Sequence, residues 1–343
     1  MTSATGAPAG RIDTRGKVVM AKLIRFHETG GPEVLRFESA EVGPPGVGEV
    51  RIRQQAIGLN YIDTYHRCGL YPVPLPSGIG LEGAGTVEAV GEAVDSLAIG
   101  DRVAYAGGPI GAYADVRNFP ADRLLRLPDS IPFETAAAMM LQGLTAQYLL
   151  RRTYRVEAGD PILIHAAAGG VGLIVCQWAK ALGATVIGTV GSPQKAELAR
   201  AHGCDHAIDY TRENFADRVR EITGGDGVPV VYDSIGKDTF MGSLSCLRPF
   251  GTMVLFGAAS GPVPPFDLGL LAKMGSLFVT RPTLFTYTAA RSDLSAMGEE
   301  LFAVVGDGRV RIEVNQRYPL AEAAQAHRDL EGRRTTGSTI LLP

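Results

Sequence analysis

The stretch from Gly159 to Lys180 constrains the fold of this chain more than any other. It reads GDPILIHAAAGGVGLIVCQWAK. Pro161–His165 is a short apolar run, which is typical of a strand buried on both faces. Small residues follow at 166–172, and Leu173–Leu182 predicts a packed helix that ends before Gly183. A strand, a turn without bulky side chains and a free helix N-terminus together form a geometry that favours a pyrophosphate.

This turn departs from the dinucleotide fingerprint G-x-G-x-x-G at its first position. In that register the residues are Ala167, Gly169 and Gly172. Glycine-rich turns also arise for packing reasons alone, so the motif needs support from its context. The run Pro161–Ala179 contains no charged residue and is about as long as a membrane-spanning helix. The alanine–glycine turn in its middle would break such a helix, and a strand–turn–helix explains the pattern better.

Length and composition indicate an ordinary globular protein of two domains. A chain of 343 residues is long for one core. Its net charge of −3 argues against a dedicated nucleic-acid binder, which would be basic. The four cysteines are far apart and form no CxxC pair, which suits a reducing cytoplasm and gives no zinc-site spacing.

The N-terminal residues, 1–19, predict a disordered tail or a start-site artefact. They are small and polar for the most part and lack an apolar stretch that would suit a signal peptide. A second methionine, Met20, opens the first patterned segment, AKLIRF.

Residues 20–130 predict a compact, partly open β-barrel of short strands. Val50 and Ile52 alternate with Arg51 and Arg53, which gives one buried face. Gly-Pro, Gly-Asp and Pro-Asp breaks separate the further candidates. These are Val34–Glu38, Thr86–Val90, Arg102–Ala106, Tyr113–Val116 and Leu124–Leu127. Helices are predicted at Pro132–Leu141 and Leu144–Arg151.

From residue 159 the pattern alternates between strand and helix. Such alternation predicts a parallel, doubly wound α/β sheet, here of six strands. The strand candidates are Ile162–His165, Thr185–Thr189, His206–Asp209, Val230–Asp233, Thr252–Phe256 and Leu277–Thr280. Helices are predicted at Pro193–His202 and Glu213–Ile222. After about residue 283 the pattern is mixed again, and Ser338–Leu342 is predicted to complete the first domain.

The end of the second strand predicts which dinucleotide is bound. A site for NAD places an acidic residue there, about 20 residues after the fingerprint, to hold the ribose. Here the strand ends in Val190-Gly191-Ser192 instead. Ser192 looks like an N-cap before Pro193, and Lys195 lies in the first helical turn, where a cation opposes the helix dipole. Ser192 and Lys195 are therefore candidates for holding the 2′-phosphate of NADPH, the alternative being that Lys195 is a solvated surface lysine.

Nothing in the sequence indicates a metal centre or a nucleophilic triad. His66 and Cys68 lie close together, a spacing that favours local packing over a metal centre. His165 lies in a buried strand and is interpreted as a core histidine, and no Ser-His-Asp arrangement is suggested. Hydride transfer from a reduced nicotinamide needs no metal when the acceptor is already electrophilic, as a quinone or conjugated enone is.

Together these residues resemble the zeta-crystallin-like NADPH:quinone oxidoreductases, which are zinc-free members of the medium-chain dehydrogenase/reductase superfamily. The resemblance covers about residues 20–343. Its most specific part is Gly159-Asp160, Leu163, Ala167-Ala168-Gly169-Gly170, Gly172, Gln177 and Lys180; the segments 58–65, 69–72, 80–85 and 331–338 support it. Zinc relatives carry a histidine where Leu81 stands and a cysteine near Asn60, and both are absent here.

The resemblance implies a GroES-like β-barrel domain at 20–144 and 283–343 and a Rossmann NADPH-binding domain at 145–282. It implies three groups of cofactor contacts: the pyrophosphate, the adenosine end with its phosphate, and the nicotinamide. In that order, the contacts are Ala168, Gly169, Gly170 and Val171 for the pyrophosphate; Gly191, Ser192, Lys195, Tyr210 and Arg333 for the adenosine end; and Asn60, Tyr65, Thr145, Phe256 and Gly257 for the nicotinamide.

Asn60, Tyr65 and Tyr71 are the implied catalytic residues, and the two tyrosine hydroxyls would hydrogen-bond a quinone oxygen. The alternative for both tyrosines is packing within the β-barrel. Tyr210 is likewise compatible with a half-buried place at a strand end.

The sequence thus predicts a cytoplasmic, zinc-independent enzyme that reduces quinones with NADPH in the cleft between its domains. Two alternatives stay open: an NADPH-dependent reductase of enones or enoyl thioesters, and a non-enzymatic, crystallin-like NADPH-binding or RNA-binding protein. The acidic balance weighs against RNA, and no membrane association is expected. The family implies a homodimer, and the apolar run Thr252–Phe256 near a sheet edge is compatible with strand pairing across subunits.

Overall fold

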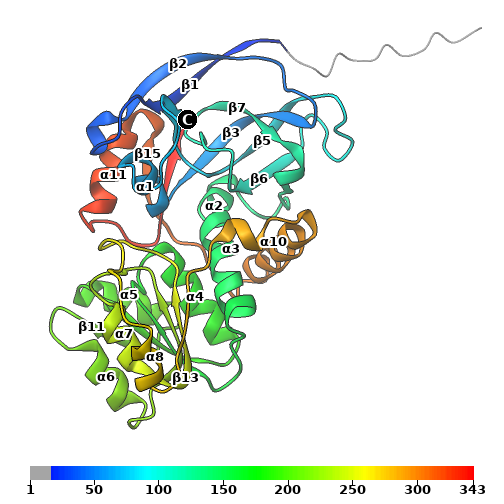
Figure 1. Cartoon of the computed structure of the whole chain (residues 1–343). Coiled ribbons are helices and arrows are strands. Elements are labelled where there is room, and N and C mark those ends of the chain that lie inside the picture. Colours follow the sequence, from blue (N-terminus) through cyan, green and yellow to red (C-terminus); the bar gives the residue numbers. More distant parts are fainter. Residues whose placement is uncertain (1–16) are drawn as a thin grey trace, which may run out of the picture.

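A parallel sheet of six strands forms the lower lobe of the molecule in Figure 1. A computed structural model of the protein describes residues 17–343. The strand order is β11-β10-β9-β12-β13-β14, and every neighbouring pair is parallel. Their bounds are β9 Pro161–Ile164, β10 Thr185–Val190, β11 His206–Asp209, β12 Val228–Asp233, β13 Leu247–Leu255 and β14 Phe278–Thr280. The predicted doubly wound sheet is confirmed, and its order reverses between β9 and β12.

Helices flank this sheet in the alternation that the sequence predicts. They are α4 (Gly170–Ala181), α5 (Pro193–Ala201), α6 (Phe215–Ile222), α7 (Phe240–Cys246) and α8 (Gly269–Lys273). Local chemistry sets several of their ends. The Ser192 side chain caps α5, Asn214 caps α6, and Gly183 follows α4 with φ +88°.

The upper lobe is the predicted partly open barrel, and its long strand β3 (Glu49–Leu59) lies at the centre. Its main sheet runs β15-β16-β3-β5-β6-β8, with β7 also paired to β3. The bounds are β5 Glu82–Val90, β6 Arg102–Ala106, β7 Val116–Pro120, β8 Leu125–Arg126, β15 Val314–Pro319 and β16 Ser338–Leu342. Because β16 pairs antiparallel with β3, the C-terminal strand joins this lobe as predicted. A smaller sheet holds β2 (Arg36–Val42), β1 (Val19–Phe26) and β4 (Ser77–Gly78).

The remaining helices lie on the barrel or between the lobes. They are α1 (Tyr61–Arg67), α2 (Phe133–Ala137), α3 (Met140–Tyr148), α9 (Leu284–Tyr287), α10 (Arg291–Gly306) and α11 (Ala323–Glu331). A π-helical turn, η3 (Leu149–Thr153), continues α3, and short 3-10 turns occur at η1 (Pro32–Val34), η2 (Ala121–Arg123) and η4 (Leu320–Glu322). One buried core cluster contains side chains of both lobes, including Met140, Ile164 and Leu301.

Three predicted elements differ from the structure. The strand expected at Val34–Glu38 begins at Arg36, because Pro32 favours a 3-10 turn before it. The strand expected at Tyr113–Val116 is β7, which only begins at Val116. Tyr113 instead accepts a hydrogen bond from Ile24 N of the smaller sheet, at 2.8 Å.

The third difference is the break between the two helices that precede the fingerprint. It was expected near residue 143 and lies at 138–139. The backbone N–H of Leu141 donates to Glu82 Oε1 at 2.9 Å, so a buried tertiary contact satisfies the start of α3.

The proposed domain boundaries stay a prediction, and α3 continues across the first of them, at 144/145. Residues 1–16 of the predicted tail at 1–19 lie outside the described residues. Of the other three, Val19 is the first residue of β1. None of the helices from residue 17 onward combines the length and the apolar character needed to cross a membrane.

Candidate active site

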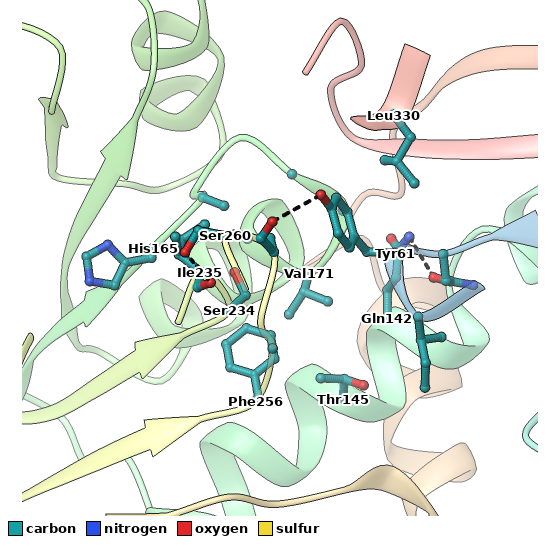
Figure 2. A pocket seen from close by; sticks show the side chains of 18 of the residues that line it. Tyr61, Gln142, Thr145, His165, Val171, Ser234, Ile235, Phe256, Ser260 and Leu330 are labelled. Atoms are coloured by element: carbon teal, nitrogen blue, oxygen red, sulfur yellow. Dashed lines mark hydrogen bonds between the residues drawn. The ribbon is translucent and has the colours of Figure 1, made fainter. Parts of the chain in front are cut away.

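A cavity of about 1020 Å³ lies between the two lobes. Its walls come from the carboxyl ends of β9, β10, β12 and β13, from α1 and α3, and from the segments 281–285 and 330–339. Figure 2 shows Tyr61, Gln142, Thr145, Val171 and Phe256 around this space. Ligands of open α/β sheets bind in the crevice at the point where the strand order reverses, which is where this cavity lies.

The predicted dinucleotide turn opens onto the cavity at the start of α4. The amides of Ala167 and Gly169 donate to Thr189 O at 3.0 Å and Ala166 O at 2.9 Å, so the free amides are those of residues 170–172 in the first helical turn. Gly169 is the N-cap of α4 and provides no side-chain cap. The Leu173 amide is the first that has a helical acceptor, Gly169 O at 2.9 Å. A Cβ on Gly172 would lie 2.3 Å from Ala166 O, so only glycine fits there. The turn and its free amides therefore suit a pyrophosphate, as the sequence predicts.

Two cations meet at the end of β10, where an NAD site would carry a carboxylate. Lys195 Nζ donates to Arg333 O at 2.9 Å, and both side chains line the cavity. Burial, and then the charge of Arg333, lower the pKa of Lys195. Among the ion pairs of the described residues, none involves either side chain. Two neighbouring cations without a carboxylate partner form a place for a phosphate.

Gly191 and Tyr210 complete this end of the cavity. A Cβ on Gly191 would lie 2.6 Å from the Tyr210 hydroxyl, so the absence of a side chain lets the aromatic ring approach the strand end. Both residues line the cavity, as predicted, and Tyr210 is 43% exposed. Ser192 is the one predicted cofactor residue that is not part of the lining; its hydroxyl accepts a hydrogen bond from Lys195 N at 3.2 Å as the N-cap of α5.

Asn60 lies at the opposite end, with its side-chain amide held on both sides. Its Nδ2 donates to Glu82 Oε2 at 2.5 Å, and its Oδ1 accepts from Gln142 Nε2 at 3.2 Å. Burial raises the pKa of Glu82 to about 8, although hydrogen bonds from Asn60 and Leu141 oppose this shift. The two contacts fix which way the Asn60 carboxamide points.

The tyrosine hydroxyls predicted to be catalytic contact the other lobe rather than the barrel core. Tyr65 Oη accepts a hydrogen bond from Ala258 N at 2.9 Å, and Tyr71 Oη accepts one from Arg281 Nη2 at 3.0 Å. Because each oxygen already accepts, the proton of each hydroxyl can be donated to a ligand. Burial raises the pKa of Tyr65 to about 12, so this group keeps its proton at neutral pH.

His165 is a satisfied buried histidine, as the sequence predicts. Its Nδ1 lies 2.8 Å from Thr189 Oγ1 and its Nε2 lies 2.9 Å from Ser243 Oγ. The structure does bring together a Ser-His-Asp group that the sequence did not suggest. However, the Ser243 hydroxyl donates to Asp233 Oδ2 at 2.9 Å, so its proton points away from the histidine. This arrangement does not activate Ser243 as a nucleophile.

The other predicted cofactor residues all line the cavity: Thr145, Ala168, Gly170, Val171, Phe256 and Gly257. His66 lines it as well, beside the ring of Tyr71, while Cys68 is exposed. Within residues 17–343, no group of three or more His, Cys, Asp or Glu side chains is placed to hold a metal ion.

Sequence reasoning missed three features of this site. Arg281 directly follows β14, so the rule that ligands meet the carboxyl ends of parallel strands could have found it. Gln142 gives no such signal, because its role depends on contact with Asn60 across the fold. Helix α1 was not predicted, although Asn60 and Asp63 have a capping spacing and Asn60 N donates to Asp63 Oδ2 at 2.9 Å.

Comparisons with known proteins agree with this architecture. Residues 46–129 match the family described as alcohol dehydrogenase GroES-like domain, and residues 170–302 match that described as zinc-binding dehydrogenase. The quinone oxidoreductase of Pseudomonas aeruginosa is 59% identical over 325 residues, covering 94% of this chain and 100% of that protein. The chain belongs to the quinone oxidoreductase family of the medium-chain dehydrogenase/reductase superfamily. The predicted resemblance and fold are therefore confirmed, and the chain is an oxidoreductase.

Other relatives place the family in structural and chemical context. The Escherichia coli quinone oxidoreductase, solved in complex with NADPH, has a TM-score of 0.91 at 50% identity, covering 94% of this chain and all of that one. A mycobacterial protein solved with NADPH has a TM-score of 0.91 at 48% identity, with the same coverage. A 2-haloacrylate reductase of a Burkholderia species is 48% identical, covering 95% of this chain and 99% of that protein.

Proposed function

We propose that this protein reduces quinones by hydride transfer from NADPH in the cavity between its lobes. The observation that carries the cofactor assignment is the pair Lys195 and Arg333 at the end of β10, where a carboxylate would favour NADH. The cofactor is NADPH, with which the Escherichia coli and mycobacterial relatives were solved. When bound, it supplies a hydride; with one proton from solvent, the quinone becomes a hydroquinone and NADPH becomes NADP+.

The residues of the Rossmann lobe bind and orient this cofactor. The free amides at the start of α4 take the pyrophosphate, and Lys195 and Arg333 take the 2′-phosphate. Ser192 contributes indirectly, because its hydroxyl caps the helix that carries Lys195. The nicotinamide end is lined by Asn60, Thr145, Phe256 and Gly257, and the adenosine end by Gly191 and Tyr210.

Three residues of the barrel lobe orient the acceptor. The hydroxyls of Tyr65 and Tyr71 hydrogen-bond a quinone oxygen and stabilise the charge that develops on it. Asn60, held by Glu82 and Gln142, fixes the position of the ring that accepts the hydride. Since a hydroquinone oxygen is protonated by solvent, no side chain has to lose a proton.

Purified protein mixed with NADPH and a panel of quinones tests this proposal through the loss of NADPH absorbance. Turnover is expected without added metal, and elemental analysis is expected to find no stoichiometric zinc. Absence of turnover with every acceptor, while NADPH still binds, would favour the non-enzymatic alternative. Turnover that is lost on chelation would contradict zinc independence.

The alternative acceptor is a conjugated carbonyl compound, and the likeness to a 2-haloacrylate reductase favours it. The same cofactor site would serve both reactions. Comparing kcat/KM for benzoquinones, small enones and an enoyl-CoA separates them. A specificity constant at least about tenfold higher for the enones, equivalent to about 1.4 kcal/mol in transition-state stabilisation, would reassign the substrate class.

We also propose a cytoplasmic homodimer. The strand at the edge of the six-stranded sheet is β14. The predicted run Thr252–Phe256 lies one strand further in, because all of it but Phe256 belongs to β13. Phe278 on β14 is 60% exposed and Phe250 nearby is 71% exposed, so this edge presents apolar surface for strand pairing. Sedimentation equilibrium would show twice the chain mass, and a monomer at micromolar concentration would contradict the proposal.

The cytoplasmic location is supported by the cysteines. All four cysteines are free, which suits a reducing compartment.

A further inference from the structure

The cavity wall carries a third cation besides Lys195 and Arg333. Arg281 follows β14 and lines the cavity in contact with Tyr71, far in the chain from the cations of the phosphate end. Its Nη2 donates to Tyr71 Oη and its Nη1 donates to Leu255 O, each at 3.0 Å. Within residues 17–343 none of the ion pairs includes Arg281. The guanidinium is therefore held in place by neutral oxygens; Arg281 is exposed to solvent, and no carboxylate of the described residues pairs with it.

The surroundings of Arg281 are rich in hydroxyl donors. Tyr65 and Tyr148 both lie close enough for its charge to lower the pKa of their hydroxyls, although burial raises both pKa values more strongly. Tyr71 Oη already accepts from Arg281, so its proton is directed elsewhere. Asp238 is the one acidic residue among the described residues that line the cavity, and it belongs to the loop after β12, not to the segment that carries Arg281. A guanidinium with unused N–H groups, next to a hydroxyl donor, matches a planar or tetrahedral oxyanion.

We propose that Arg281, together with Tyr71, selects acceptors that carry an anionic group, a carboxylate or a sulfonate, next to the reducible double bond. This inference rests on the proposed function and specifies its substrate class. The anion lies against the guanidinium while the conjugated system lies toward Phe256 and Gly257, the part of the cavity assigned to the nicotinamide. An uncharged quinone can still enter, but it gains no charge-assisted hydrogen bond from the guanidinium, which then stays hydrated.

A matched pair of acceptors tests this selection: 1,4-naphthoquinone and 1,4-naphthoquinone-2-sulfonate. The quantity compared is the ratio of kcat/KM for the sulfonate to that for the neutral quinone, in the wild type, Arg281→Met and Arg281→Lys. The loss of a charge-assisted hydrogen bond predicts that Arg281→Met lowers this ratio by at least about tenfold. Arg281→Lys keeps the charge and should retain most of the ratio, whereas a role limited to holding Tyr71 would lower both specificity constants together.

Arg309→Met is the control variant, because Arg309 is an exposed arginine just after α10. It pairs with Asp307 and does not line the cavity. Its ratio should equal that of the wild type. If the ratio of specificity constants in Arg281→Met stays within about twofold of the wild-type ratio, the inference is overturned, even if quinone turnover is normal.

A binding experiment separates failure of this inference from failure of the proposed function. In the complex with NADP+ no hydride is available, so the dissociation constants of the two naphthoquinones can be measured by calorimetry. If neither quinone is reduced with NADPH, the proposed function fails. The preference for the sulfonate, and its loss in Arg281→Met, would still support the anion site; equal affinities in both proteins would refute it.

Discussion

Replacing Lys195 by alanine should change the cofactor preference of this protein more than its general affinity for nucleotides. Lys195 Nζ lies on the cavity wall 2.9 Å from Arg333 O, and no carboxylate of the described residues forms an ion pair with it. A charge-assisted hydrogen bond to a phosphate contributes about 1.5–3 kcal/mol. Loss of Lys195 should therefore weaken NADPH binding by about 10- to 150-fold relative to NADH.

The magnitude stays at this level because the lysine is partly exposed. Two unit charges 4 Å apart near a protein surface interact by about 4 kcal/mol, which is an upper bound before solvent screening is included. The Lys195→Ala substitution removes the hydrogen bond to Arg333 O whichever of the two nucleotides is bound. Its contribution therefore cancels when the two nucleotides are compared, and the ratio of dissociation constants isolates the phosphate contact.

Isothermal titration calorimetry of NADPH and NADH against the wild type and Lys195→Ala measures this ratio. Lys180→Ala is a suitable control, because Lys180 pairs with Asp205 and does not line the cavity. The reasoning is refuted if Lys195→Ala weakens both nucleotides equally, or if the wild type binds them equally well. Arg333→Met should shift the ratio in the same direction, and its effect should not add fully to that of Lys195→Ala.

Three further outcomes are expected from the geometry. Gly172→Ala places a Cβ 2.3 Å from Ala166 O and should destabilise the fold by about 1–3 kcal/mol in urea denaturation, while weakening NADPH binding. Gly306→Ala, with open space around it, is the control, and equal stability of the two variants would contradict the packing argument. Tyr65→Phe should lower kcat/KM for a quinone by about three- to tenfold, the contribution of one neutral hydrogen bond; a thousandfold loss would instead make Tyr65 an obligatory proton donor. Since burial raises the pKa of Glu82 to about 8 from an ordinary value of 4.5, the folded state keeps a proton that the unfolded state releases between these values. The stabilising contribution of the raised pKa is present below the lower value and is lost as the pH rises through about 8. Glu82→Gln should therefore reduce the fall in unfolding free energy over this pH range. Identical slopes of unfolding free energy against pH in the two proteins would show that Glu82 ionises normally.

The sequence alone indicated which segments bind the cofactor, because that chemistry is local. A strand, a small-residue turn and a helix are consecutive in the chain, and Gly191, Ser192 and Lys195 lie within five residues of one another. The resemblance to the family then added Phe256, at the end of the fifth predicted strand, to the same site. These residues line one cavity in the structure, apart from Ser192, whose hydroxyl is used as a helix cap.

Tertiary structure decided the features that depend on contacts between distant segments. The start of α3 depends on Glu82, 59 residues earlier in the chain, and the orientation of Asn60 depends on Gln142, 82 residues away. Arg281 meets Tyr71 across 210 residues, so no local pattern could indicate that a cation lies beside the tyrosine hydroxyl. Short-range periodicity and capping determine strands, turns and helix ends. Which polar groups face one another in the cavity is set only when the two lobes pack together.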